Sequence, residues 1–183
     1  MNKDTISPRD AQWRDELRRS STAKERTSIP RVKMGELAPD YRVTCNEEVN
    51  RGLSREEAVM EAKRCLDCPD PQCVTGCPVN VNIPGFIKNI ERENFRDAAV
   101  VLKESSALPA VCGRVCPQER QCESKCIYNK MKREPVAIGY LERFAADNER
   151  LSGEAVLPPC DAPKGMKIAV AGSGPASLSF AGE

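Results

Sequence analysis

The chain has 183 residues, the length of one domain or of one domain with a fragment of another. Lys and Arg total 28 and Asp and Glu total 27, and the net charge of +1 argues against binding of the whole chain to nucleic acid or an anionic membrane. Hydrophobic residues make up 40% and aromatic residues 4%, so the core is small. Ten cysteines and no histidine exclude Cys/His and Ser/His/Asp catalytic groups and every imidazole metal ligand.

The cysteines are expected to bind metal. No apolar run reaches the roughly 18 residues that cross a bilayer, and the N-terminus has no apolar segment typical of a secretory signal. We therefore expect a cytoplasmic protein, in which metal ligation is favoured over the alternative of disulfides.

Residues 1–40 form a polar, basic N-terminal arm, with nine Lys and Arg against five Asp and Glu up to Lys33. A short helix is expected through Trp13 and Leu17. Such a charge run is typical of a solvated face, and the alternative is a docking arm for a partner.

Helices are predicted through the middle of the chain. Ser54 and Glu57 form a capping box that starts one helix. Others are predicted from Pro84, from Asn94 and after Pro135. Each has apolar residues at helical spacing whose simplest role is core packing: Phe86, Ile87, Ile90, Phe95, Ala98, Ala99, Leu102, Ile138, Leu141 and Phe144.

Two cysteine runs have the densest spacing in the chain. The first reads Cys-x2-Cys-x4-Cys-x3-Cys-Pro, and the second reads Cys-x3-Cys-Pro-x4-Cys-x3-Cys. Two zinc sites of four thiolates each are one interpretation, although zinc favours cysteine pairs that are well separated in sequence. The crowding and the Cys-Pro steps favour [4Fe–4S] clusters, as in the bacterial ferredoxin run. The members are Cys65, Cys68, Cys73 and Cys77, then Cys112, Cys116, Cys122 and Cys126.

The cysteines of the two runs can be divided between two clusters in two ways. In the ferredoxin run the last cysteine serves the other cluster, and by that rule Cys77 leaves the cluster of the first three cysteines. Simple proximity would instead place the four cysteines between Cys112 and Cys126 on one cluster. Cys45 and Cys160 are isolated and have no expected role.

The last part of the chain has the pattern of a dinucleotide-binding fold. Residues 151–165 contain three prolines and two glycines and are expected to be a linker. An apolar strand is predicted over residues 166–171, before Gly172-Ser-Gly174-Pro-Ala-Ser177, which should open a helix. Ser177 stands where Gly or Ala is usual, and the acidic residue expected about 20 positions later falls beyond Glu183.

Three segments together resemble one family. They read EAKRCLDCPDPQCVTGCPVNVNIPGFI, ALPAVCGRVCPQERQCESKC and EPVAIGYLERFAAD. From about Val43 onward the chain resembles the N-terminal iron–sulfur domain of the small (beta) subunit of NADPH-dependent glutamate synthase. Related proteins are the large subunit of electron-bifurcating NADH-dependent ferredoxin:NADP oxidoreductase and the N-terminal part of dihydropyrimidine dehydrogenase.

The resemblance implies a mostly α-helical domain over residues 41–150 that binds two [4Fe–4S] clusters and shares ligands between the two runs. It implies that Glu142 is a non-cysteine ligand and that Cys112 is not a ligand. The implied ligands are Cys65, Cys68, Cys73 and Cys126 for the first cluster, and Cys77, Cys116, Cys122 and Glu142 for the second.

The resemblance also implies an electron-transfer function. In the parent enzyme NADPH would reduce FAD, and single electrons would pass through the clusters to an FMN-containing synthase subunit or an equivalent acceptor. Residues 166–183 would be the truncated start of the Rossmann-like FAD domain, with Gly172, Gly174 and Ser177 at the cofactor. FAD and NADPH are expected in the full-length parent only, and we assign no catalytic residue to this fragment.

Two alternatives stay open. One is a zinc-stabilised interaction module without a redox role. The other is the same iron–sulfur domain from a ferredoxin:NADP oxidoreductase or dihydropyrimidine dehydrogenase relative, because substrate chemistry lies outside this sequence.

Overall fold

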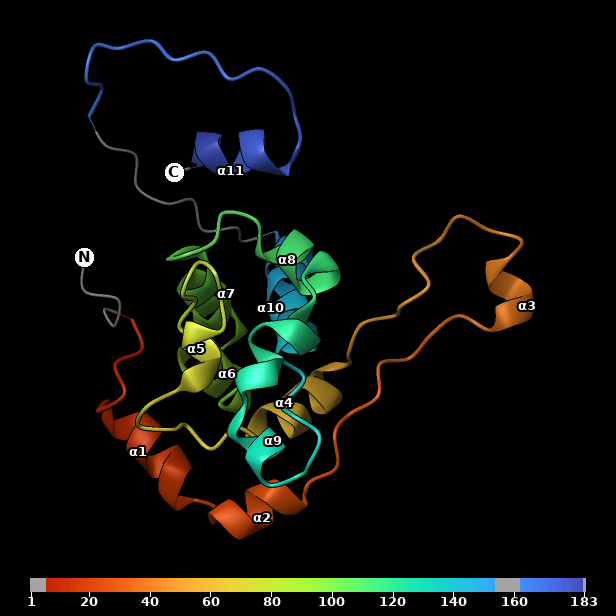
Figure 1. The fold of residues 1–183 in the computed structure, drawn as a ribbon, viewed down its shortest axis with the longest axis vertical. Coiled ribbons are helices and arrows are strands. Elements are labelled where there is room, and N and C mark those ends of the chain that lie inside the picture. Colours follow the sequence, from red (N-terminus) through yellow and green to blue (C-terminus); the bar gives the residue numbers. More distant parts are fainter. Residues whose placement is uncertain (1–5, 154–161, 183) are drawn as a thin grey trace.

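The computed structural model describes residues 6–153 and 162–182, and this part of the chain is mostly helical (Figure 1). Two 3-10 turns lie at Gln118–Arg120 and Glu123–Lys125. The helices are α1 Gln12–Arg19, α2 Ala23–Ser28, α3 Pro39–Arg42, α4 Arg55–Lys63, α5 Gln72–Thr75, α6 Ile83–Glu91, α7 Phe95–Lys103, α8 Pro109–Val115, α9 Ile127–Lys130, α10 Ile138–Ser152 and α11 Pro175–Gly182.

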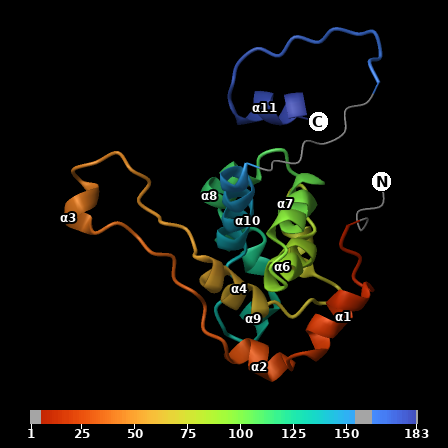
Figure 2. The same cartoon turned by 180° about the vertical axis from the view of Figure 1, so that it is seen from behind.

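A bundle of α4, α6, α7, α8 and α10 contains the core (Figures 1 and 2). Its buried apolar side chains include Ala58, Ala62, Phe86, Ile87, Ile90, Val101, Leu102, Leu141 and Ala145. Gly113 lets α8 approach α10 closely, since a Cβ at this position would lie 2.6 Å from the backbone nitrogen of Arg143. The apolar stripes predicted for this part of the chain therefore pack as expected.

Side-chain caps start α4 and α7 where the sequence predicts. The Ser54 side chain accepts a hydrogen bond from the Glu57 backbone N–H at 3.2 Å, and the Glu57 carboxylate accepts one from the Ser54 N–H at 2.7 Å. Asn94 caps α7 by accepting from the Asp97 N–H. These caps satisfy backbone donors that have no partner within the helix.

The basic N-terminal arm packs against the bundle rather than facing solvent throughout. Helices α1 and α2 lie along one end of the bundle in both ribbon views (Figures 1 and 2). Arg14 and Arg26 are only 2% and 3% exposed. The solvated face expected from this charge run is therefore wrong for these two arginines, because each is paired with a buried carboxylate.

A loop that carries α3 projects from the bundle in both ribbon views (Figures 1 and 2). One isolated β-bridge, between Glu36 and Asn50, joins its two ends. Cys45 lies on this loop, outside the bundle. Cys160 and most of the predicted linker lie outside the described residues.

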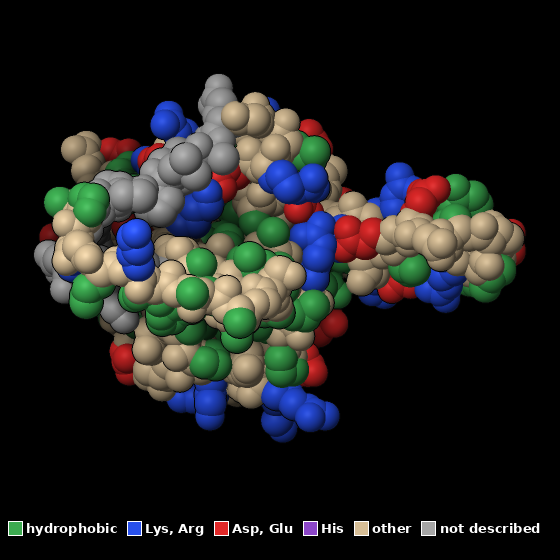
Figure 3. All heavy atoms as spheres, turned by 90° about the horizontal axis from the view of Figure 1, so that it is seen from above, with side chains coloured by type: hydrophobic (Ala, Val, Ile, Leu, Met, Phe, Trp, Pro, Cys, Tyr) green, Lys and Arg blue, Asp and Glu red, His purple; other side chains and the backbone are tan. Residues whose placement is uncertain are grey.

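The strand predicted over residues 166–171 does not form. A strand needs a neighbouring strand for its backbone hydrogen bonds, and no strand lies beside it within the described residues. Helix α11 does follow the glycine-rich turn, in which Gly172 has φ of 102°. Ile168, Val170 and Phe180 are exposed, and hydrophobic side chains are open on the face at this end of the molecule (Figure 3).

None of the helices in the described ranges is both long enough and apolar enough to span a membrane.

Candidate metal centre

Four cysteines drawn from both runs line one cavity of about 350 Å³. They reach it from the loop after α4, from α5 and from the position just before α9. Much of the remaining wall is apolar, with Ile83, Ile87, Val136 and Ile138 among its residues. We call these four residues the first group: Cys65, Cys68, Cys73 and Cys126.

Burial makes these thiols hard to ionise. It raises the pKa of Cys65 to about 11, although the Lys88 ammonium opposes part of the shift. It also raises the pKa of Cys68 and of Cys73, and in both cases the nearby Cys126 thiol raises it further. Thiolates gathered in an apolar cavity repel one another, so they need a cationic metal group to balance them.

A second set of side chains lies together where α8, the second 3-10 turn and α10 meet. Burial raises the pKa of Cys122 to about 12, and the charges of Glu123, Cys77 and Glu142 add to the increase. Burial likewise raises the pKa of Cys116 to about 11, with smaller contributions from Cys112, Glu142 and Cys77. We call the four implied ligands here the second group: Cys77, Cys116, Cys122 and Glu142.

Glu142 is the buried carboxylate of the second group. It lies on α10 with 9% of its surface exposed, and it makes no hydrogen bond or ion pair with the described part of the chain. Burial alone raises its pKa to about 7. A carboxylate in such a position is costly unless a cation or a donor meets it, and this fits a metal ligand.

Cys112 also lies beside the second group. It lies on α8, four residues before Cys116 at the C-cap of that helix, and its thiol contributes to the raised pKa of Cys116. The Cys112 sulfur is 3.8 Å from the Ser106 hydroxyl oxygen. The structure therefore brings Cys112 close to the implied ligands, and its exclusion from the ligand set stays a prediction.

In space the cysteines form groups that differ from the two runs in the sequence. Cys126 belongs to the second run by sequence but lies in the cavity with Cys73. Cys77 belongs to the first run but lies near Cys116 and Cys122. No three Cys, Asp or Glu side chains within the described residues are placed to hold a single metal ion.

Sequence reasoning missed three charged residues beside these groups. Asp67 lies between two cysteines of the first group and is 1% exposed. Lys88 is fully buried on α6 and donates a hydrogen bond to the Cys65 carbonyl at 2.6 Å. Glu123 follows Cys122 and is 5% exposed. Of these three residues, only Lys88 could have been noticed in the sequence, because it is a single cation among the apolar residues of α6.

A comparison with known domain families agrees with this chemistry. Residues 42–154, more than half of the chain, match the family described as dihydropyrimidine dehydrogenase domain II, 4Fe-4S cluster. The match includes both groups of candidate ligands. The chain belongs to this family. As a domain II member it is a helical 4Fe-4S domain, and the resemblance found in the sequence is confirmed.

Curated relatives of this domain II chain are oxidoreductase subunits. The NAD-dependent dihydropyrimidine dehydrogenase subunit PreT of Escherichia coli K12 is 41% identical over 132 residues, which is 72% of this chain and 32% of the relative. The glutamate synthase [NADPH] small chain of the same strain is 38% identical over 136 residues, 73% of this chain and 28% of the relative. The chain thus spans about a third or less of the length of these proteins.

Proposed function

We propose that this domain relays single electrons within a larger nicotinamide-dependent oxidoreductase, from FAD to a flavin on a partner subunit. Its family and its relatives support a role in electron transfer, since both relatives above are named as nicotinamide-dependent enzyme subunits. Such a relay needs redox groups that are enclosed by protein and held by fixed ligands.

The two groups of side chains are the proposed ligands of two [4Fe–4S] clusters. When bound, each cluster supplies one-electron chemistry, with a potential set by ligand type, hydrogen bonds and burial. The observation that carries this proposal is the cavity shared by Cys65, Cys68, Cys73 and Cys126, because it brings cysteines from both runs together among largely apolar side chains.

The second site would differ from the first in its ligand chemistry. Three thiols and the carboxylate of Glu142 form the second group, whereas the first has four thiols. A carboxylate is a harder and weaker donor than a thiolate, so we expect the two clusters to have different potentials and distinct spectra.

The glycine-rich turn at Gly172, Gly174 and Ser177 is the proposed start of an FAD domain in the full-length parent. The Ser177 hydroxyl donates a hydrogen bond to the Ala171 carbonyl at 3.2 Å, and Ser177 lies in the first turn of α11, which begins at Pro175. NADPH would bind further along the parent. The partner would be an FMN-containing synthase subunit or an equivalent electron acceptor.

Stepwise anaerobic reduction, followed by electron paramagnetic resonance, tests the relay. The wild-type chain should accept about two electrons and give two distinct [4Fe–4S]-type signals. Cys73→Ser should remove one signal and Cys122→Ser the other, which assigns each signal to a group. A chain that accepts no electrons, although its ligands are intact and its metal content is full, would contradict the proposal.

A further inference from the structure

The segment of residues 7–31, which we call the N-terminal strap, contacts the loops that carry both groups of candidate ligands. It includes α1 and α2 and lies outside the residues matched by the family model. Three of its arginines contact the Asp67 and Glu123 carboxylates, which lie on those loops beside the cysteines. The strap therefore meets the metal centre through a small number of buried ion pairs.

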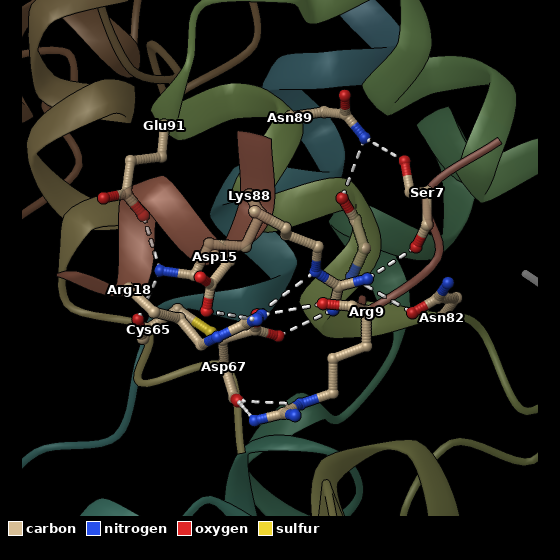
Figure 4. Close-up of polar contacts among 12 residues, drawn as sticks. Ser7, Arg9, Asp15, Arg18, Cys65, Asp67, Asn82, Lys88, Asn89 and Glu91 are labelled. Atoms are coloured by element: carbon tan, nitrogen blue, oxygen red, sulfur yellow. Dashed lines mark hydrogen bonds and ion pairs between the residues drawn. The ribbon is translucent and has the colours of Figure 1, made fainter. Parts of the chain in front are cut away.

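Asp67 is the first contact point, in the short loop between Cys65 and Cys68. Arg14 binds its carboxylate with two nitrogens, at 2.6 and 3.2 Å. Arg18 binds it at 2.8 Å (Figure 4). The Asp67 side chain is fully buried, and its backbone is left-handed with φ of 52°. The strap thus fixes this unusual backbone position by charge-assisted hydrogen bonds.

Arg9 adds a hold on the backbone of the same loop. Its guanidinium donates two hydrogen bonds to the Asp67 carbonyl, at 3.1 and 3.3 Å (Figure 4). A third connection is indirect: Arg26 pairs with Glu91 at 2.8 Å, and Glu91 pairs with Lys88 at 2.5 Å. Lys88 in turn donates to the Cys65 carbonyl.

Arg31 makes the corresponding contact on the other loop. It binds the Glu123 carboxylate at 2.8 Å and donates to the Pro135 carbonyl at 2.8 Å. Glu123 directly follows Cys122, and its second oxygen accepts a hydrogen bond from the Gly139 N–H at the start of α10. One carboxylate next to each group is therefore tied to the strap.

We propose that the N-terminal strap positions both ligand loops, with Asp67 acting on the first group and Glu123 on the second. This inference rests on the proposed function, because it gives each ion pair a role in holding one cluster. Neither carboxylate is among the implied ligands, so each would act through the cysteines beside it. Removal of the Asp67 charge takes an ion-pair partner from buried Arg14. Removal of the Glu123 charge takes one from partly buried Arg31, so each change frees one loop only.

Two neutral variants of the full chain separate these roles. Asp67→Asn keeps the shape and the tolerance for a left-handed backbone but loses the charge. Glu123→Gln likewise keeps the shape of the side chain and loses its charge on the second loop. Glu93→Gln is the matched control, because Glu93 also has positive φ and an arginine partner, Arg55, but lies at the surface. Each protein is purified without air and then exposed to air while its iron and its two assigned resonance signals are followed.

We expect Asp67→Asn to lose the first signal, with about four of about eight irons, and to keep the second. Glu123→Gln should lose the second signal and keep the first. Glu93→Gln should match the wild type. If both test variants lose iron no faster than Glu93→Gln, the positioning role is wrong. If the wild type itself contains no iron, the proposed function fails first, and the strap has no cluster to position.

A second pair of variants tests the same contact with less disturbance, in case Asp67→Asn misfolds. Arg18 is partly exposed, so its replacement leaves a smaller buried defect. Arg18→Gln should speed loss of the first signal alone, and Arg18→Lys should restore much of its lifetime, since a cation again faces Asp67. Circular dichroism should show the same helix content in both. Equal signal lifetimes in Arg18→Gln and the wild type would overturn the inference.

Discussion

Cys126, the last cysteine of the second run, lies in the same cavity as Cys73 of the first run. The two runs are therefore interleaved in space, and the structure brings a cysteine of the second run next to cysteines of the first. This arrangement ties the loop after α4 to the turn before α9. The position of Cys126 also distinguishes the two groupings. Family resemblance implies that Cys126 joins the first group, whereas proximity along the chain would keep it with the second run.

Single cysteine substitutions should distinguish these groupings. Cys126→Ser should affect the same cluster as Cys73→Ser, because both side chains line one cavity. Each should retain about half of the iron. Iron analysis and resonance spectra after anaerobic purification measure this. If Cys126→Ser instead removes the signal lost in Cys122→Ser, the grouping by proximity is correct.

Cys112→Ser is the informative companion, since Cys112 lies beside Cys116 but is not an implied ligand. Both clusters should persist with unchanged stoichiometry, while the second signal shifts slightly because a neighbouring thiol has changed. Loss of the second cluster in Cys112→Ser, combined with its survival in Glu142→Ala, would reassign the fourth ligand to Cys112.

The stability of the metal-free chain should depend on pH through Glu142. Its pKa is about 7 in the fold against an ordinary value of 4.5. Because the pKa of Glu142 is raised in the folded state, its contribution to the unfolding free energy is fully present below about pH 4.5. That contribution is lost as pH rises through 7. Relative to Glu142→Gln, the metal-free wild type should lose about 3 kcal/mol of unfolding free energy over this range. Urea titrations at about pH 5 and about pH 8 measure it, and an equal pH response in both proteins would contradict it.

Lys88→Met should weaken the fold and change the first cluster. The ammonium is buried, pairs with Glu91 and donates to the Cys65 carbonyl. Without the ammonium, the Glu91 carboxylate and the Cys65 carbonyl each lose one donor, and this should cost about 3 kcal/mol of unfolding free energy. Removal of a positive charge near the first group should also lower that cluster's reduction potential, with little change at the second. A redox titration monitored at both signals would show whether the shift is confined to the first.

The ligand loops should be the least protected part of the bundle once metal is removed. Residues 65–77 and 112–126 contain short helical turns and loops, whereas α6 and α10 have buried apolar faces. Hydrogen exchange should therefore speed up in the two loops on metal removal and change little in those two helices. Uniform acceleration across the whole chain would instead mean that the core itself depends on the clusters.

Local features of this fold were predictable from the sequence, and features that need distant partners were not. The caps at Ser54 and Asn94 start helices through contacts within a few residues, so their patterns suffice. The strand predicted over residues 166–171 needs neighbouring strands, which the described residues do not provide. Burial of Arg14 depends on Asp67, a partner far along the chain that a charge pattern does not identify.

The candidate site divides in the same way. The cysteine spacing indicated iron–sulfur chemistry, and the family match confirms a 4Fe-4S domain. Spacing alone did not decide which cysteines share a cluster, because a loop can fold towards either of the chain segments beside it. Family resemblance implied that Cys126 joins the first group, and the cavity brings these side chains together. Their role as ligands stays a prediction.

Metal analysis of the chain purified without air tests the central claim most directly. Two [4Fe–4S] clusters require about eight iron and about eight acid-labile sulfide per chain, without stoichiometric zinc. About two zinc and no sulfide, the content of two tetrathiolate zinc sites, would contradict the electron-transfer function proposed for this domain.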